Sequence, residues 1–354
     1  MELLERTIKE IGPLNQEALE KAQKRLDNLA IPLGSLGKIG KVGVQVAGIT
    51  GHFPPEIPKK AIILMAGDHG VATEGVSAFP QAVTQQMVYN FAKGGATINV
   101  FSRHAGAELV LVDVGVAADL PDIPGLIKKK VAYGTKSMLH GPAMTREEAV
   151  KALEVGIEVS QEKIKSGVTL IGLGDMGIGN TTPSSALIAC FGKLPVEKVT
   201  GPGTGLDQEG LKNKIRVIEE AIKLNNPNPN DPIDVLAKIG GLEIAGLAGV
   251  TLGAASAGIP IVFDGLISTA AVLTAYQICP QVRNYLIGSH LSMEPGHHYM
   301  LQFLEIQPML VLDMRLGEGT GGALNMLMIE AGIKALREVA TFDDAQVSKG
   351  ESDD

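Results

Sequence analysis

The spacing of apolar residues predicts that the chain begins with helices. Leucines and alanines recur every three or four positions along residues 15–29, which places one apolar stripe on a helix. Asn15 stands just before this stripe, and asparagine is a favoured helix N-cap. The next segment, IPLGSLGKIG at 31–40, is rich in glycine, so it is expected to end the helix and to be irregular.

From residue 60 onward the pattern changes to short, continuous apolar runs separated by longer segments with helical spacing. The runs lie at 61–66, 109–112, 168–171 and 259–263. Runs without strict alternation predict strands that are covered on both faces of a sheet. The helical patterns lie at 81–104 (interrupted at Gly94-Gly95), 145–165, 183–191, 209–224, 232–239, 245–257 and after Gly322. This alternation predicts an α/β fold with a mostly parallel sheet and helices on both faces.

The helices at the two ends of the chain lie outside the alternation. We expect them to form a small helical domain from residues 1–55 together with 318–345. Residues 56–317 would then form the large α/β domain, and residues 346–354 a disordered tail. No sharp linker in the sequence marks these boundaries.

Composition narrows the class of protein. The chain has 354 residues, of which 45% are hydrophobic, so a sizeable core is expected and global disorder is excluded. The net charge is −8, and aromatic residues are only 4% with no Trp. These values argue against a surface that binds duplex or single-stranded nucleic acid. An anionic ligand must therefore be held by local donors, and the 43 glycines suggest many places where backbone approaches a ligand.

Location is predicted from the termini and the cysteines. The N-terminus carries charge from residue 2 and lacks the apolar stretch of a signal peptide. The uncharged residues between Glu243 and Asp264 are small and include Pro260, so they predict a buried helix and a strand rather than a membrane span. Cys190 and Cys279 stand in apolar contexts and form no CxxC motif. A cytoplasmic protein without membrane contact is expected.

The segment VTLIGLGDMGIGNTTP at 168–183 has the spacing Gly172-x-Gly174-x-x-Gly177 between a predicted strand and a predicted helix. Glycines allow backbone N–H groups to approach a phosphate, and the helix adds its positive N-terminus. The match to the dinucleotide fingerprint is poor, because Glu197 does not end a second strand. A nucleotide or sugar-phosphate site is favoured, while NAD binding and a turn without a ligand stay open.

Two further glycine loops each precede a helix. GPGTG at 201–205 is followed by Lys214 and Arg216, either of which can turn toward a phosphate or simply face solvent. RLGEGTGG at 315–322 places Glu318 between glycines. Partial desolvation there would raise the pKa of Glu318, which suits a general base, although a flexible surface turn has the same pattern.

Other catalytic signatures are missing. His69, His290, His297 and His298 do not have HExxH or CxxC-type spacing, so a metal site is not expected. The sequence also lacks a Gly-x-Ser-x-Gly elbow and a GxxxxGK[ST] loop, which argues against a serine hydrolase and against hydrolysis of ATP or GTP.

Seven segments, taken together, resemble the nicotinate-nucleotide–dimethylbenzimidazole phosphoribosyltransferase (CobT) family of cobamide biosynthesis. In order they are PLGSLGKIG, AGDHGV, EGVSAFP, GLGDMGIGNTTP, GPGTGLD, DGLIS and RLGEGTGGAL, and the resemblance covers about residues 15–345. It implies a Rossmann-like large domain, a small helical domain from both chain ends, a homodimer and no cofactor. It also implies transfer of phosphoribose from nicotinate mononucleotide to a lower-ligand base.

The resemblance assigns roles residue by residue. Glu318 matches the family's catalytic glutamate, which takes the N–H proton of the incoming base. The departing pyridinium discharges its own positive charge, so the chemistry needs neither an acid nor a metal. The phosphate and ribose would be held by Gly177, Asn180, Thr181, Gly203, Lys214 and Arg315, with Asp264 a weaker candidate for the ribose or nicotinate pocket.

The base pocket departs from the family pattern. Asp175 is the second candidate catalytic residue: it stands where many members have glutamate near the incoming base, and its part in proton transfer is open. Phe79 replaces a serine seen in relatives and, with Met87 and Leu316, makes this pocket more apolar. We hypothesise that the preferred base is another benzimidazole, adenine or a phenol, and that a paralogous subunit is a possible partner. An NAD-dependent oxidoreductase and a non-catalytic nucleotide-binding or partner subunit are the alternative functions.

Overall fold

The computed structural model describes residues 1–348. A six-stranded sheet forms its centre, with strand order β3-β2-β1-β4-β5-β6 and every neighbouring pair parallel. This is the order of doubly wound dinucleotide-binding folds, so the predicted Rossmann-like α/β class is confirmed. The strands are β1 (Lys60–Gly67), β2 (Ala107–Gly115), β3 (Leu126–Lys128), β4 (Leu170–Met176), β5 (Ile261–Phe263) and β6 (Leu286–Gly288). A separate parallel pair joins β7 (His290–Leu291) to β8 (Leu310–Val311).

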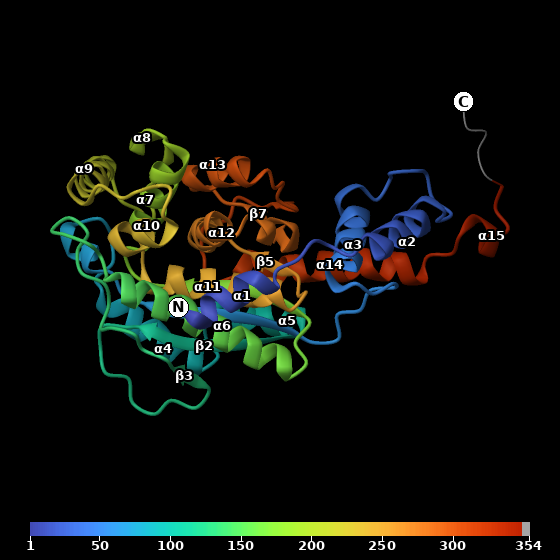
Figure 1. Cartoon of the computed structure of the whole chain (residues 1–354), viewed down its shortest axis with the longest axis horizontal. Coiled ribbons are helices and arrows are strands. Elements are labelled where there is room, and N and C mark those ends of the chain that lie inside the picture. Colours follow the sequence, from blue (N-terminus) through green and yellow to red (C-terminus); the bar gives the residue numbers. More distant parts are fainter. Residues whose placement is uncertain (349–354) are drawn as a thin grey trace.

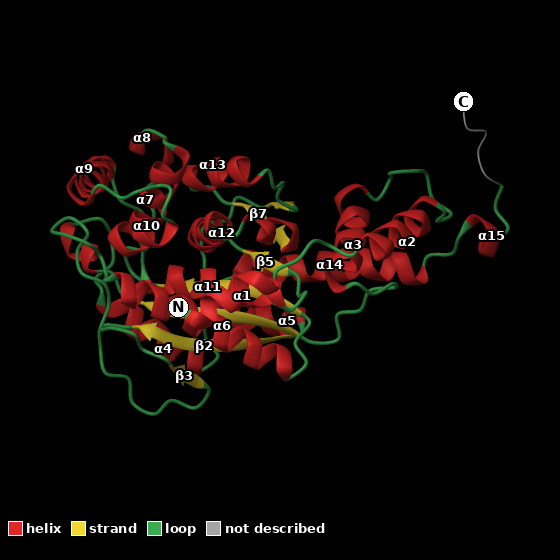
Figure 2. Cartoon of the chain, viewed as in Figure 1, coloured by secondary structure: helices red, strands yellow, loops and turns green. Residues whose placement is uncertain are grey.

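Helices cover both faces of the sheet, as Figure 2 shows. Strand β1 is buried along its whole length, and its side chains alternate between two cores. Ala61, Ile63 and Met65 belong to one core, and Ile62, Leu64 and Ala66 to the other. This two-residue period is that of any strand, and both sets are apolar because both faces are covered.

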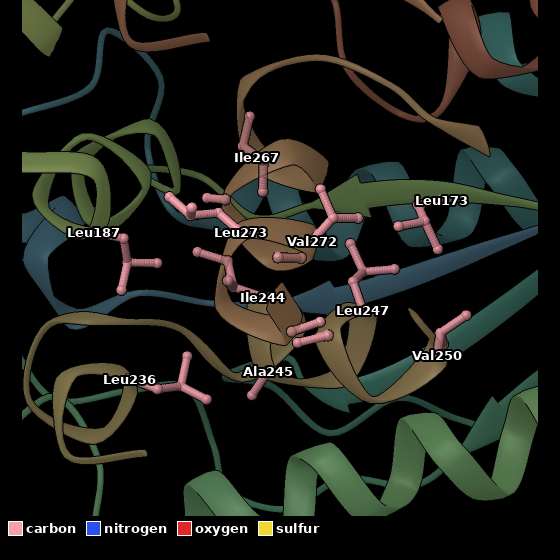
Figure 3. Close-up of a cluster of buried hydrophobic side chains, with 14 of the residues drawn as sticks. Leu173, Leu187, Leu236, Ile244, Ala245, Leu247, Val250, Ile267, Val272 and Leu273 are labelled. Carbon is pink, nitrogen blue, oxygen red and sulfur yellow. The ribbon is translucent and has the colours of Figure 1, made fainter. Parts of the chain in front are cut away.

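The larger core lies between the sheet and a layer built on α6 (Arg146–Lys165), α11 (Leu242–Ser256) and α12 (Leu266–Ile278). Figure 3 shows part of it, with Leu247 and Val250 of α11, Val272 of α12 and Leu173 of β4 among the buried side chains. Residues 242–255 of α11 are all buried, which explains the uncharged segment in the sequence. Within the described residues, no helix has both the length and the apolar character needed to cross a membrane.

The opposite face is covered by α4 (Ala82–Ala92), α5 (Thr97–Ala105) and the first half of α14 (Thr320–Glu338). The remaining helices are α1 (Glu2–Glu10), α2 (Gln16–Asp27), α3 (Gly37–Thr50), α7 (Thr181–Gly192), α8 (Val196–Val199), α9 (Gln208–Asn225), α10 (Pro232–Ile239), α13 (Pro295–Leu304), α15 (Phe342–Ala345) and the 3-10 helices η1 (Gly70–Glu74) and η2 (Pro280–Tyr285).

Capping residues in the sequence correctly predicted where two helices begin. Asn15 Oδ1 accepts a hydrogen bond from Ala18 N, and Thr145 and Glu148 form a reciprocal capping box, as predicted. The segment 31–40 is only partly irregular, because α3 already begins at Gly37. Two glycines of α3 pack tightly, Gly40 against Leu26 and Gly43 against the α14 backbone, and these contacts outweigh their low helix propensity.

Helices α2 and α3 pack against one another and against α14, and they lie beside its far end at the right of Figure 1. Helix α1 is different, because it contacts α6 and α11 on the sheet layer. The division into residues 1–55 with 318–345 and residues 56–317 stays a prediction. Of the expected disordered tail at 346–354, residues 349–354 lie outside the described part of the chain.

Candidate active site

A cavity of about 450 Å³ opens where the carboxyl ends of the central strands meet their following loops. Parallel strands bring such loops to one edge of a sheet, which is where doubly wound folds bind ligands. Ten of the predicted site residues line the cavity: Phe79, Met87, Asp175, Gly177, Asn180, Thr181, Gly203, Arg315, Leu316 and Glu318. A larger hollow of about 750 Å³ lies elsewhere, but on its wall Lys129 is already paired with Glu158 and the N-terminal amine with Glu154. The smaller cavity, which contains the predicted site residues, is therefore the better candidate for the active site.

Glu318 is held in a strained turn. Its φ is +63°, between Gly317 at +87° and Gly319 at +91°, and a non-glycine residue rarely adopts this region. The side chain is 8% exposed, and its Oε2 accepts a hydrogen bond from Ile98 N at 3.2 Å, in the first turn of α5. Burial raises the pKa of Glu318, and the negative charge of Asp264 adds to this against the opposing Ile98 bond.

Asp175 lies next to the last residue of β4 and also lines the cavity. Its Oδ2 accepts a hydrogen bond from Asn180 Nδ2 at 3.0 Å, whereas its Oδ1 is buried without a partner. Burial raises the pKa of Asp175 well above its usual value, and the charges of Asp264, Glu243 and Glu318 act in the same direction. The neutral acid is therefore favoured at this position.

Another part of the cavity wall is formed by the two loops 177–181 and 201–205. Lys214 reaches them from α9 and is fully buried, with its Nζ donating to Thr181 Oγ1 at 2.7 Å and to Gly201 O at 3.1 Å. It lies behind Thr181 rather than on the cavity wall. Burial lowers the pKa of Lys214 to about 8, and the Glu294 charge opposes this shift. Arg315 Nη1 donates to Gly203 O at 3.2 Å.

The glycine motif at 172–177 has a different role from the predicted one. Strand β4 extends to Met176, so Gly172 and Gly174 lie inside the strand and not in a phosphate loop. A Cβ on Gly172 would approach Ile62 Cδ1 to 2.3 Å, and one on Gly174 would approach Glu318 O to 2.4 Å. These glycines allow close packing on the sheet. Only Gly177 reaches the cavity, and a Cβ there would lie 2.2 Å from Gly67 O.

Asp264, the weaker candidate for a ligand contact, does not line the cavity. Its carboxylate is fully buried beneath the Glu318 turn and accepts hydrogen bonds from the backbone of that turn and of α14. His69 is similarly buried beneath the Gly177 turn, with Nε2 donating to Glu243 Oε1 at 2.7 Å. Burial lowers the pKa of His69, but the charge and hydrogen bond of Glu243 outweigh it and leave the pKa raised.

Sequence reasoning missed Ser292 and Glu294 on the cavity wall. Glu294 Oε1 accepts a hydrogen bond from Gly203 N at 3.0 Å, so it fixes the second loop. The strands β6 and β7 are only three and two residues long, and β7 begins with a histidine, so no apolar run in the sequence marks the residues after them. The loop carrying Phe79 is tied to the same region, because Ala78 N donates to Thr204 Oγ1 at 3.0 Å.

The histidines considered for metal binding lie in different environments. His290 lines the cavity, and His297 lies behind it with Nδ1 accepting from Ser292 N at 2.9 Å. Burial lowers the pKa of His297 to about 3, so it is neutral at physiological pH. Among residues 1–348, no three His, Cys, Asp or Glu side chains are grouped as a metal site would require.

Comparison with known proteins agrees with this geometry. A family model described as phosphoribosyltransferase matches residues 11–347. Nicotinate-nucleotide–dimethylbenzimidazole phosphoribosyltransferases are 54% identical over 351 residues in Geobacter sulfurreducens (99% of this chain, 100% of the relative) and 53% identical over 349 residues in Chloroflexus aggregans (99% of each). The crystal structure of the Thermus thermophilus enzyme of that name superposes with a TM-score of 0.91 at 43% identity, covering 95% of this chain and 100% of the other. None of these proteins is named as an oxidoreductase. The chain belongs to the nicotinate-nucleotide–dimethylbenzimidazole phosphoribosyltransferase (CobT) family and is an enzyme that transfers a phosphoribosyl group.

Proposed function

We propose that this phosphoribosyltransferase acts on nicotinate mononucleotide and a lower-ligand base, 5,6-dimethylbenzimidazole or a related base. The products are nicotinate and the α-ribazole 5′-phosphate used in the nucleotide loop of cobalamin. The names of the relatives supply both substrates. The observation that carries the proposal is Glu318, a carboxylate with a raised pKa that faces a cavity large enough for two ring systems and a ribose.

The bond changes balance without a cofactor. A ring nitrogen of the base, or the hydroxyl oxygen of a phenol, forms the new bond to C1′ while the bond from C1′ to the pyridinium nitrogen breaks. The released electron pair neutralises the pyridinium, so the leaving group needs no proton. Glu318 takes the N–H proton of the base, or the O–H proton of a phenol. Attack on the face opposite the leaving group inverts C1′, which turns a β-nucleotide into an α-product, and holding the two reactants in line supplies much of the rate.

Glu318 suits this role because its environment tunes its basicity. A general base works best when its pKa lies near the operating pH, and burial moves the pKa of Glu318 upward in that direction. The Ile98 hydrogen bond engages Oε2 and fixes the carboxylate at the N-terminus of α5. In this proposal Oε1 is the oxygen that receives the proton.

The loops 177–181 and 201–205 would hold the 5′-phosphate. Gly177, Asn180, Thr181 and Gly203 line that part of the cavity, with Lys214 behind Thr181 and Arg315 on the outer side. The phosphate does not react, so these residues contribute binding that is equal in the ground state and the transition state.

The incoming base would pack on the apolar side of the cavity. Phe79 and Leu316 are about half exposed there, and Val83 and Met87 complete the surface. Side chains without polar atoms give little discrimination between planar rings of similar size. We therefore propose a broad base preference in which another benzimidazole, adenine or a phenol competes with dimethylbenzimidazole. A clear preference for dimethylbenzimidazole in an equimolar competition would contradict this.

The first test is chromatographic. Purified protein is incubated with nicotinate mononucleotide and, separately, with dimethylbenzimidazole, adenine or phenol. Base-dependent release of nicotinate with an equal amount of an α-riboside phosphate supports the proposal and ranks the bases. If none of the bases causes release, the result would instead favour a non-catalytic protein or one that needs a paralogous subunit.

The matched variant is Glu318→Gln, which keeps the shape of the side chain and removes the base. We expect kcat to fall by about 10²–10⁴-fold, as for loss of a general base, while nicotinate mononucleotide still binds. Isothermal titration of the variant with the mononucleotide measures that binding. An unchanged kcat would remove Glu318 from this role.

We further propose a homodimer in the cytoplasm, on the resemblance to the family alone. Sedimentation equilibrium of the purified chain tests the assembly. A dimer mass supports the proposal, and an active monomer contradicts it.

A further inference from the structure

The Glu318 turn rests on one buried carboxylate. Asp264 follows β5 directly and is 0% exposed. Its Oδ2 accepts a hydrogen bond from Gly319 N at 3.1 Å, and its Oδ1 accepts from Gly321 N at 2.7 Å and Gly322 N at 3.2 Å. The Gly319 amide belongs to the turn, and the Gly321 and Gly322 amides belong to the first turn of α14. Backbone N–H groups in the first turn of a helix have no acceptor within the helix. Asp264 therefore closes the start of α14 from a different strand.

The turn needs such an anchor because its conformation is strained. Three consecutive residues, 317–319, have positive φ, and the middle one is not glycine. A residue in that region persists only where its surroundings hold it. Other contacts of this turn are hydrogen bonds from Thr320 N and Oγ1 to Gly317 O, a bond from Ala323 N to Gly319 O, and the packing of Glu318 O against Gly174. The Asp264 bonds are the charged contacts to this backbone, and charge-assisted bonds are the stronger kind.

We propose that Asp264 is a positioning residue for the phosphoribosyl transfer: by binding the backbone of residues 319–322 it holds Glu318 in the conformation that faces the cavity. This inference rests on the proposed function of Glu318 as the base. It also gives Asp264 a role other than the ligand contact expected from the sequence, since its carboxylate lies under the turn and not on the cavity wall.

Asp264 acts on Glu318 through its negative charge in addition to its hydrogen bonds to the turn. The negative charge raises the pKa of Glu318, in addition to burial. Three other groups contribute to this electrostatic environment: His290 Nδ1 lies 3.5 Å from Asp264 Oδ1, Asp175 interacts electrostatically with both acids, and the Ile98 amide donates to Glu318. Removing the Asp264 charge alone should therefore lower the pKa of Glu318.

The test compares Asp264→Asn with Asp113→Asn. Asparagine is isosteric but lacks the charge, and its N–H₂ group cannot accept from a backbone amide. Asp113 is the matched control, because it is also buried at a strand end and accepts from a backbone amide of its own loop, Val116 N at 2.9 Å. It lies at the end of β2 and does not line the cavity.

For Asp264→Asn we expect kcat to fall about 10- to 100-fold, the usual cost of a misplaced catalytic group, with KM for the mononucleotide within about twofold. The acid limb of the kcat profile should move to lower pH. Adding Asp264→Asn to Glu318→Gln should cause no further loss, because a residue that acts only through Glu318 has nothing left to position. Asp113→Asn should leave kcat and its pH profile unchanged.

Three results would overturn the inference. One is a folded Asp264→Asn variant with unchanged kcat. The second is a raised KM with unchanged kcat, which would make Asp264 a ligand contact. The third is failure of both Asp264→Asn and Asp264→Ser to fold while Asp113→Asn folds, which would make Asp264 a requirement of the fold. Failure of the proposed function is distinct, since the wild-type chain would then release no nicotinate with any base.

Discussion

At the scale of single residues, the site is defined by carboxylates that are buried close to one another. Burial raises the pKa of Asp175, Asp264 and Glu318, and their mutual repulsion adds to this effect in Asp175 and Glu318. Like charges in one buried site do not all ionise together. Asp175, whose pKa is raised well above its usual value, is the acid expected to keep its proton, which leaves Glu318 free to act as the base.

This assignment predicts the effect of Asp175→Asn. Asn180 already donates to Oδ2, so the amide oxygen can take that position and the amide N–H₂ can take the position of Oδ1, which has no partner. We expect kcat/KM within about threefold of wild type at pH 7, whereas Asp175→Ala should lose considerably more. Initial-rate assays of the two variants decide it. A loss in Asp175→Asn as large as in Glu318→Gln would mean that Asp175 must ionise during the reaction.

The lowered pKa of Lys214 predicts that the affinity for nicotinate mononucleotide depends on pH. Its pKa is lowered to about 8, so its positive charge is present below that pH and is lost above it. KM for nicotinate mononucleotide should therefore rise as the pH increases through 8, with kcat little changed. Lys214→Met should raise KM by roughly 10- to 100-fold, the value of a charged hydrogen bond, and remove this pH dependence. The control is Lys212→Met on the same helix, which removes an exposed lysine paired with Glu209. A KM that is flat with pH in the wild-type enzyme would contradict the prediction.

At the scale of elements, β4 and the turn before α14 are in direct backbone contact. Gly172 and Gly174 point to the same face of the strand, two residues apart, but they meet different neighbours. A side chain on Gly172 would meet the ends of Ile62 and Met326, which can move. A side chain on Gly174 would meet the carbonyl of Glu318, which cannot move without displacing the turn that carries Glu318.

The pair of variants Gly172→Ala and Gly174→Ala separates packing from catalysis. Both should lower the free energy of unfolding, by about 1–3 kcal/mol for an overpacked core site. Only Gly174→Ala should also reduce kcat, by about tenfold or more, because it shifts Glu318. Urea denaturation and steady-state rates measure the two effects. Equal rates in the two variants would show that the contact at Gly174 does not control the turn.

At the scale of the whole molecule, the buried acids of this site make the stability of the fold depend on pH. An acid whose folded pKa is raised binds its proton more tightly in the folded state than in the unfolded state. Its favourable contribution is full below the unfolded pKa of about 4 and is lost as the pH rises through the folded pKa. Each buried acid of this cluster therefore contributes less to the stability of the folded enzyme at neutral and alkaline pH than it does below pH 4.

This sign predicts that Asp175→Asn is more stable than wild type at pH 8. We expect Tm to rise by a few degrees at pH 8 and the difference to shrink near pH 4, where the wild-type acid is protonated in both states. Thermal unfolding followed by circular dichroism at the two pH values tests it. An equal difference at both pH values would assign the change to packing and not to the charge.

The amino-acid sequence by itself determined the class of fold, and its motifs pointed to ten of the residues that line the cavity. Buried strands and capped helices leave local signals, as at Asn15 and Thr145, because apolar periodicity and capping depend on residues a few positions apart. Parallel topology then brings the strand ends, and the polar loops after them, to one edge. The resemblance to the family identified Glu318, and the cavity contains it.

Only the tertiary structure decided what several of these residues touch. The glycines at 172 and 174 have the spacing of a phosphate loop, but the sheet continues through them because Glu318 and α14 pack against that strand. Asp264 is 54 positions before Glu318 in the chain and binds the turn that carries it. Glu294 fixes Gly203 from a segment without a strand signal. Contacts between residues so far apart in the chain depend on how strands and helices pack, and no local pattern in the sequence records that packing.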